Sequence, residues 1–241
     1  MQILGVEASY TVDTMTEILQ ETAIPGDTIV YMLGSSTLTY DHGGSDFITT
    51  SIALESDKEK LTNYWNRHLW DYGTLKNILL YRKLYTMFAS KPVEAVRTKI
   101  SDKEQVYDIA SFDEKGMMTA VREGTLISTE VVPVEVLEFS NINLRALEIL
   151  NEFKVWCDEN DVTLYICYAP LIEGSVITDE DGIAKYHEDV VAYMDCEILG
   201  RPEDYFLPVE DFYNHIYHLN TDGAKAYSQI LSEKILEARG M

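Results

Sequence analysis

Near its C-terminus the chain reads Asp211-Phe-Tyr-Asn-His-Ile-Tyr-His-Leu-Asn-Thr-Asp-Gly223, a polar and aromatic stretch with two histidines. Either Asn220 or Thr221 can accept the main-chain N–H bonds that the first turn of a helix leaves without partners. The apolar residues that follow have helical spacing: Ala224, Tyr227, Ile230, Leu231 and Ile235. The pattern predicts that His218 lies in a loop directly ahead of a rigid helix, where a side chain can reach a substrate. The simpler interpretation is a histidine that only bonds to the main chain and packs.

Two short segments of the chain, Asp27–Leu33 and Val162–Tyr168, are almost wholly apolar. This pattern is typical of strands that are buried on both faces of a parallel sheet. Other segments alternate with them: helices are predicted at residues 11–21, 141–159 and 179–194, and a short strand at 197–200. The alternation indicates an α/β fold in which a mainly parallel sheet lies between helical layers. The chain contains no G-x-G-x-x-G string, so a dinucleotide-binding fold is not indicated.

The middle of the chain is less regular. Its helical patterns predict a helical insertion at residues 55–92, within a single domain that spans residues 1–241. The periodicity fades over residues 93–129, where we expect a loop with short strands or turns. Residues 131–139 are rich in strand-forming types, and Pro133 favours the edge of a sheet.

The chain is strongly acidic, with 41 acidic residues against 19 basic ones and a formal charge of −22. Such a field repels nucleic acid and anionic lipid, so we expect neither as a partner. No apolar run approaches the ~20 residues of a membrane span, so no membrane segment and no signal peptide are predicted. The three cysteines are widely spaced and form no C-x-x-C pair, which favours buried thiols over a disulfide framework or a zinc site.

The block His218-Leu219-Asn220, with Gly223 after it and Phe212-Tyr213 before it, resembles the last conserved block of the SGNH (GDSL-like) hydrolases. The bacterial members that it resembles are related to surface-polysaccharide O-acetyl transfer and D-alanyl transfer. The resemblance implies a three-layer α/β/α, flavodoxin-like fold. It also implies an esterase or O-acyltransferase that acts on cell-surface carbohydrate or a small acyl ester, without a cofactor. Relatives often work outside the cytoplasm. The histidine of this block is the general base in that family.

The family's nucleophile is a serine in a Gly-x-Ser turn after the first strand of the sheet. The segment Gly34-Ser35-Ser36 has this form, so the resemblance nominates Ser36 as nucleophile. The oxyanion or substrate contacts that it implies are Gly34, Ser35 and His215. The alternative is a serine-rich turn without chemistry. The segment Leu4–Ser9 and the elements after it also resemble the second unit of the family fold. On that alignment the nucleophile strand would precede residue 1 or be missing.

Relatives carry an aspartate three or four residues before the histidine, and these positions here are His215 and Asn214. An asparagine can hold the imidazole but cannot stabilise the imidazolium by charge; this change costs about four orders of magnitude in a serine protease. Asp211 is the alternative orienting acid. A competing prediction is therefore a catalytically inactive carbohydrate-binding or scaffold protein of this fold. A third is a metal site at His215-x-x-His218 with Asp211, although no H-E-x-x-H motif is present.

Overall fold

A computed structural model of the chain describes residues 12–34, 119 and 121–240. The chain divides into two compact units, and almost all described residues belong to the second, Thr16–Tyr40 with Val121–Met241. The predicted helical insertion at residues 55–92 lies outside the described residues. The single domain over residues 1–241 therefore stays a prediction.

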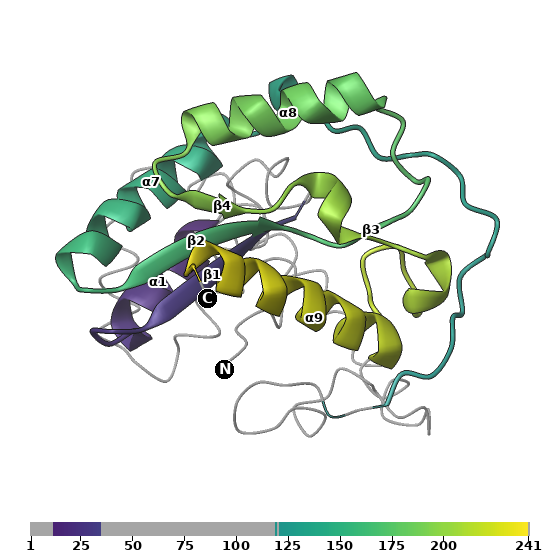
Figure 1. The fold of residues 1–241 in the computed structure, drawn as a ribbon, viewed down its shortest axis with the longest axis horizontal. Helices are drawn as coiled ribbons and strands as arrows, with labels where there is room; N and C mark the ends of the chain where they lie inside the picture. Colours follow the sequence, from purple (N-terminus) through teal and green to yellow (C-terminus); the bar gives the residue numbers. More distant parts are fainter. Residues whose placement is uncertain (1–11, 35–118, 120, 241) are drawn as a thin grey trace, which may run out of the picture. The chain divides into compact units, whose positions relative to one another are not determined.

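Among the described residues, the main sheet has three parallel strands in the order β1-β2-β4 (Figure 1). Their bounds are β1 (Thr28–Leu33), β2 (Thr163–Tyr168) and β4 (Glu197–Leu199). Strands β1 and β2 pair over their full length, from Thr28 opposite Thr163 to Leu33 opposite Tyr168. Each was expected from its apolar run, within a residue or two. Helices together with a parallel sheet are compatible with the predicted α/β class.

In the part of the chain that the structure describes, four helices accompany the sheet: α1 (Val12–Thr22), α7 (Leu144–Glu159), α8 (Glu180–Tyr193) and α9 (Thr221–Ala238). Three of them begin at a side chain that caps the first turn. In each case the Oδ1 atom of the cap accepts a hydrogen bond from a main-chain N–H. At α7, Asn143 accepts from Arg145, and at α8, Asp179 accepts from Gly182. At α9, Asn220 accepts from both Asp222 and Gly223. Because these signals are local, the starts of the helices were predictable to within a few residues.

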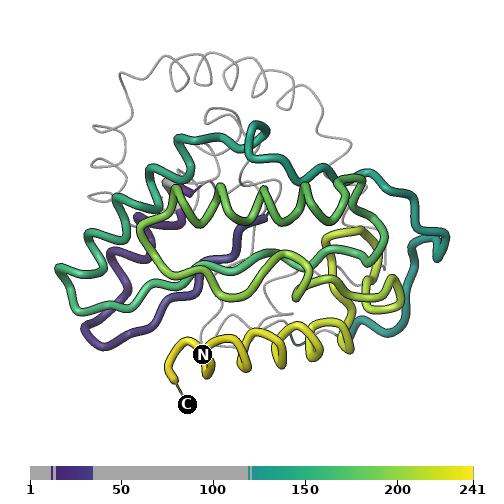
Figure 2. Tube along the Cα trace, turned by 45° about the horizontal axis from the view of Figure 1, so that its top comes forward, coloured from purple at the N-terminus to yellow at the C-terminus, as the bar shows by residue number. Residues whose placement is uncertain are grey.

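Helices α8 and α9 cover opposite faces of the sheet. The hydroxyl of Tyr227 in α9 lies 3.5 Å from the Cys167 sulfur. The next residue of β2, Tyr168, places its hydroxyl 2.9 Å from Nδ1 of His187 in α8. Consecutive strand residues point to opposite faces, so the two helices must lie on different sides. Figures 1 and 2 show the same arrangement, with α7 on the side of α8.

Helix α9 runs antiparallel to the strands. Near its C-terminal end Arg239 donates to Thr28 at the start of β1, over 2.6 Å. Nearer its middle, Tyr227 donates to the carbonyl of Tyr168 at the end of β2, over 2.9 Å. The first turn of α9, and His218 just before it, therefore lie at the carboxyl end of the sheet. Open α/β sheets bind their ligands at this end.

A second small sheet extends the fold beyond the main one. It pairs β3 (Leu171–Ile172) with β5 (Phe206–Leu207) in parallel. Three short 3-10 helices complete the described chain: η2 (Phe139–Asn141), η3 (Pro202–Tyr205) and η4 (Val209–Asp211). None of these elements was expected, because two-residue strands and single turns carry too few residues for a periodic pattern.

The predicted edge strand at residues 131–139 does not form as a regular strand. Its one bridge joins Glu135 to Val176. The N–H groups of Val134 and Glu135 both reach the carbonyl of Ser175, over 2.8 and 3.0 Å, in place of a ladder. Pro133 has no N–H to donate, which breaks the pairing just before this point. Among the described helices, none combines the length and the apolar character needed to cross a membrane.

Candidate active site around His218

The loop that carries His218 is closed by main-chain hydrogen bonds. Phe212 and Leu219 form an antiparallel bridge at its base. Inside this bridge the N–H of Tyr213 donates to the carbonyl of His218 over 2.7 Å. The N–H of His218 in turn donates to the carbonyl of His215 over 3.0 Å. The histidine is therefore fixed at both its N–H and its carbonyl, which aims its side chain.

Apolar side chains anchor the same loop to the fold. Phe212 is fully buried and belongs to a cluster with Ile172, Leu207 and Val209. Partly buried side chains from the loop and from α9 pack against this cluster, among them Ile216, Leu219, Ala226, Tyr227 and Ile230. The loop thus rests on an apolar base that joins β3, β5 and α9.

Asn220 ties the loop to the start of α9. Its Oδ1 caps the helix, and its Nδ2 donates to the carbonyl of Glu210 over 2.5 Å. Its main-chain N–H donates to the carbonyl of Asp211 over 2.8 Å. A Cβ atom on Gly223 would lie 2.1 Å from that same carbonyl oxygen, so only glycine allows this close approach. The residue types of the block are explained by these contacts.

The imidazole of His218 is held in the tautomer that a general base needs. Its Nδ1 lies 2.9 Å from Oδ1 of Asn214. Because an amide oxygen only accepts hydrogen bonds, Nδ1 carries the proton and Nε2 is left as the acceptor. Burial lowers the pKa of His218, and the charges of His215 and Arg122 lower it further. The ring is therefore neutral at pH 7 and able to accept a proton.

The structure places the other predicted residues of this loop differently. Asp211 is the last residue of η4, and its main-chain carbonyl accepts the hydrogen bond from the N–H of Asn220. Burial raises the pKa of its carboxyl group, and the charges of Asp222 and Glu210 raise it further. Within the described part of the chain its carboxylate makes no hydrogen bond to His218, whose Nδ1 is bonded to Asn214 instead. The ring centroids of His215 and His218 are 5.3 Å apart.

The metal interpretation finds no third ligand among residues 12–34 and 121–240. No group of three or more histidine, cysteine, aspartate or glutamate side chains able to hold an ion lies in these ranges.

Of the predicted nucleophile turn, the structure describes only Gly34. It follows β1, whose last carbonyl, that of Leu33, accepts from the N–H of Ala169 over 3.0 Å. Gly34 is thus at the carboxyl end of the sheet, the same end as the start of α9. Ser35 and Ser36 lie outside the described residues, and their roles stay predictions.

Sequence reasoning missed the segment 122–126, which lies against the His218 loop. Four hydrogen bonds hold it there: Arg122 N–H to Thr221 Oγ1, Thr221 N–H to Arg122 O, Asn220 Nδ2 to Gly124 O and Leu126 N–H to Tyr213 O. Arg122 and Thr221 are 99 residues apart in the chain. The segment has no periodic pattern, so nothing in the sequence indicated this contact.

A second pair of polar side chains was also missed. Tyr168, only 4% exposed, has its pKa raised by burial, so its hydroxyl stays protonated, and the hydroxyl oxygen lies 2.9 Å from Nδ1 of His187. Burial and the charge of Arg201 lower the pKa of His187. This pair lies on the α8 face of the sheet, whereas the His218 loop packs against α9.

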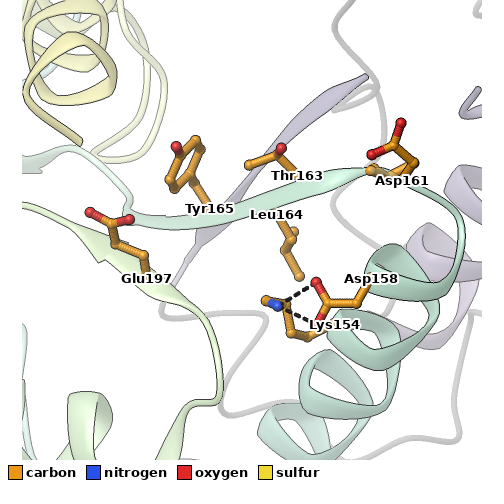
Figure 3. A pocket seen from close by; sticks show the side chains of 8 residues that line it. Lys154, Asp158, Asp161, Thr163, Leu164, Tyr165 and Glu197 are labelled. Atoms are coloured by element: carbon orange, nitrogen blue, oxygen red, sulfur yellow. Dashed lines mark hydrogen bonds and ion pairs between the residues drawn. The ribbon is translucent and has the colours of Figure 1, made fainter. Parts of the chain in front are cut away.

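A cavity of about 340 Å³ lies at the opposite end of the sheet, at the start of β2 (Figure 3). Lys154 and Asp158 of α7 form an ion pair of 2.5 Å in its wall. Leu164 points toward this pair, and Glu197 of β4 lines another side. The cavity contains neither His218 nor Asn214, so it belongs to a different part of the molecule.

Comparisons with protein-family models, with curated proteins and with solved structures find no match for this chain. The resemblance to SGNH hydrolases therefore stays a prediction.

Proposed function

We propose that this chain is an SGNH-like esterase or O-acyltransferase that acts on cell-surface carbohydrate or a small acyl ester, with His218 as general base. The observation that carries the proposal is the 2.9 Å contact between Nδ1 of His218 and Oδ1 of Asn214. It leaves Nε2 as a proton acceptor on a braced loop at the carboxyl end of a parallel sheet. The proposal includes the three-layer SGNH arrangement with a helical insertion at residues 55–92.

In the proposed reaction Ser36 is the nucleophile. Its Oγ attacks the acyl carbon of the ester while Nε2 of His218 takes the hydroxyl proton. Main-chain N–H groups around Gly34 and Ser35 stabilise the oxyanion of the tetrahedral intermediate. The imidazolium returns its proton to the leaving alcohol as the carbon–oxygen bond breaks. Water, or the hydroxyl of an acceptor sugar, then attacks the acyl-serine while Nε2 of His218 takes its proton. That proton passes to Oγ of Ser36 as the bond between Oγ and the acyl carbon breaks.

The neutral partner of His218 makes this a slow catalyst. Asn214 orients the ring as an aspartate would, but it adds no negative charge to stabilise the imidazolium. The proposal therefore favours acyl transfer at low turnover, in which orientation and oxyanion stabilisation supply most of the acceleration.

Hydrolysis of a small acetyl ester tests the proposal. We expect Ser36→Ala and His218→Ala each to abolish it, because each removes a group that moves a proton or forms a bond. His187→Ala is the matched control, since it removes a histidine of lowered pKa from α8 and should retain activity. Hydrolysis that survives both Ser36→Ala and His218→Ala would refute the proposed site.

A second candidate is a catalytically inactive carbohydrate-binding protein of the same fold. The specific observation in its favour is that Nδ1 of His218 meets the amide of Asn214, a group without charge. Calorimetry with purified surface glycans separates the two candidates. Glycan binding together with no turnover of any acetyl ester supports the second candidate and contradicts the first.

A further inference from the structure

Arg122 is unusual among the cations of this chain. Of the lysines and arginines in residues 12–34 and 121–240, it is the one whose side chain makes neither a hydrogen bond nor an ion pair. Its Nε is buried and has no partner. In a chain with 41 acidic and 19 basic residues, an unpaired arginine is unexpected, because carboxylates are abundant. A buried guanidinium N–H without an acceptor is costly and is rarely kept without a use.

The main chain holds Arg122 in a fixed place beside the candidate site. Its N–H donates to Oγ1 of Thr221 and its carbonyl accepts from the N–H of Thr221, both over 3.0 Å. Thr221 is the first residue of α9, three positions after His218. The charge of Arg122 is also close enough to contribute to the lowered pKa of His218. The main chain of Arg122 and the loop of His218 therefore belong to one braced structure, and the charge of the guanidinium acts on the imidazole.

We propose that Arg122 is an anion-binding residue that receives a carboxylate, or an oxyanion of similar shape, next to His218. A guanidinium presents N–H groups in a planar fork that matches the two oxygens of a carboxylate. An ammonium at this position would provide no such fork. Binding of an anion at Arg122 does not require that the chain catalyses a reaction. The further statement, that this anion is a charged group on the substrate or acceptor, rests on the proposed function.

Acetate and acetamide test the anion site, because they share a shape and differ in charge. NMR titration of the full chain, at constant ionic strength, follows the resonances of His218 and of the Arg122 guanidinium. We expect saturable shifts with acetate and at least tenfold weaker ones with acetamide. Inorganic phosphate in a second titration distinguishes a carboxylate fork from a general oxyanion site. Acetate should also raise the pKa of His218, since it neutralises the neighbouring positive charge.

Variants then assign the effect to one side chain. Arg122→Gln should weaken acetate binding by about tenfold or more, and Arg122→Lys should restore part of it. Arg145→Gln is the matched control and should leave acetate binding unchanged, since Arg145 already contacts Glu148 and Glu152 at 3.1 and 2.9 Å. Circular dichroism confirms that each variant is folded. Equal acetate affinity in the parent chain and in folded Arg122→Gln would overturn the proposal.

A kinetic comparison separates this proposal from the proposed function. The kinetic quantity is the kcat/KM for a carboxylate-bearing acetyl ester divided by the kcat/KM for a neutral acetyl ester. We expect this ratio to be about tenfold higher in the parent chain than in Arg122→Gln. If no ester is hydrolysed while acetate still binds through Arg122, the acyl-transfer chemistry is wrong and the anion site is right. If esters are hydrolysed and the ratio does not change, Arg122 does not select the substrate.

Discussion

Replacing Asn214 by aspartate should convert the orienting contact of His218 into a charged one. The amide oxygen lies 2.9 Å from Nδ1, and a carboxylate oxygen can occupy the same place without a change of length. The carboxylate favours the imidazolium form, whereas the amide does not. We therefore expect Asn214→Asp to raise the pKa of His218 and to accelerate any step in which this imidazole becomes protonated.

The size of the effect follows from distance and exposure. Two unit charges about 4 Å apart interact with ~4 kcal/mol at an effective dielectric constant of ~20. Asn214 is exposed and His218 is half-buried, and exposed ion pairs contribute up to about 1 kcal/mol. An intermediate value of about 1.4 kcal/mol corresponds to a rise of about one unit in the pKa of His218 and to about tenfold in kcat.

Two measurements check this expectation. NMR titration of the imidazole C–H resonance gives the pKa of His218, and its assignment comes from His218→Gln among the five histidines. Steady-state kinetics on an acetyl ester gives kcat. Asn141→Asp is the matched control because it adds the same charge at an exposed residue of η2. An unchanged His218 pKa in Asn214→Asp, or an equal rise in the control, would show that the contact does not orient the ring.

Three further expectations concern stability, pH and thiol reactivity. Gly223→Ala should lower the free energy of unfolding by about 3 kcal/mol in urea titrations, because its Cβ would lie 2.1 Å from the carbonyl oxygen of Asp211; a loss below about 1 kcal/mol would contradict the tight contact. The acid limb of the activity profile should have its midpoint below the ordinary histidine pKa of 6.5, since the pKa of His218 is lowered. Because the pKa of His218 is lower in the folded chain, the unfolded chain binds more protons than the folded chain just below pH 6.5. His218 therefore contributes stability above pH 6.5, and this contribution is lost as the pH falls through the folded pKa. Native protein at pH 8 should resist iodoacetamide at all its thiols, because burial raises the pKa to about 11 for Cys157 and Cys167 and about 12 for Cys196; rapid modification detected by mass spectrometry would contradict this burial.

The parts of this fold that the sequence predicted are those with local signals. Strand β2 has a continuous apolar run, and α9 has a capping asparagine followed by helical spacing, so both could be predicted with nearly correct bounds. The cap also located His218 ahead of the helix. The hydrogen bond to Asn214 was anticipated as a means of holding the ring, because Asn214 occupies the position where the SGNH hydrolases that the chain resembles carry an aspartate.

The contacts that sequence reasoning missed join segments far apart in the chain. Arg122 meets Thr221 across 99 residues, and β3 pairs with β5 over only two residues each. Neither contact is marked in the sequence by a periodic pattern or a motif. The pairing of irregular segments that are far apart in the chain depends on the complete fold. The predicted strand at residues 131–139 was wrong for a related reason. Its residue types favour a strand, but Pro133 has no N–H to donate, and the N–H groups of Val134 and Glu135 share one acceptor, the carbonyl of Ser175. Among the described residues, only the bridge between Glu135 and Val176 forms there.

The net charge of −22 gives the anion site at Arg122 an unusual salt dependence. At an ionic strength of ~0.01 M the Debye length is ~30 Å, so the whole acidic chain repels an approaching carboxylate. At ~0.15 M it is ~8 Å, so the distant acids are screened while the contact with the guanidinium is hardly weakened. Acetate binding should therefore strengthen between these two ionic strengths, whereas an isolated ion pair weakens. We would measure it by NMR titration with a weakly coordinating salt. A steady weakening with added salt would mean that acetate binds to scattered surface cations and not to Arg122.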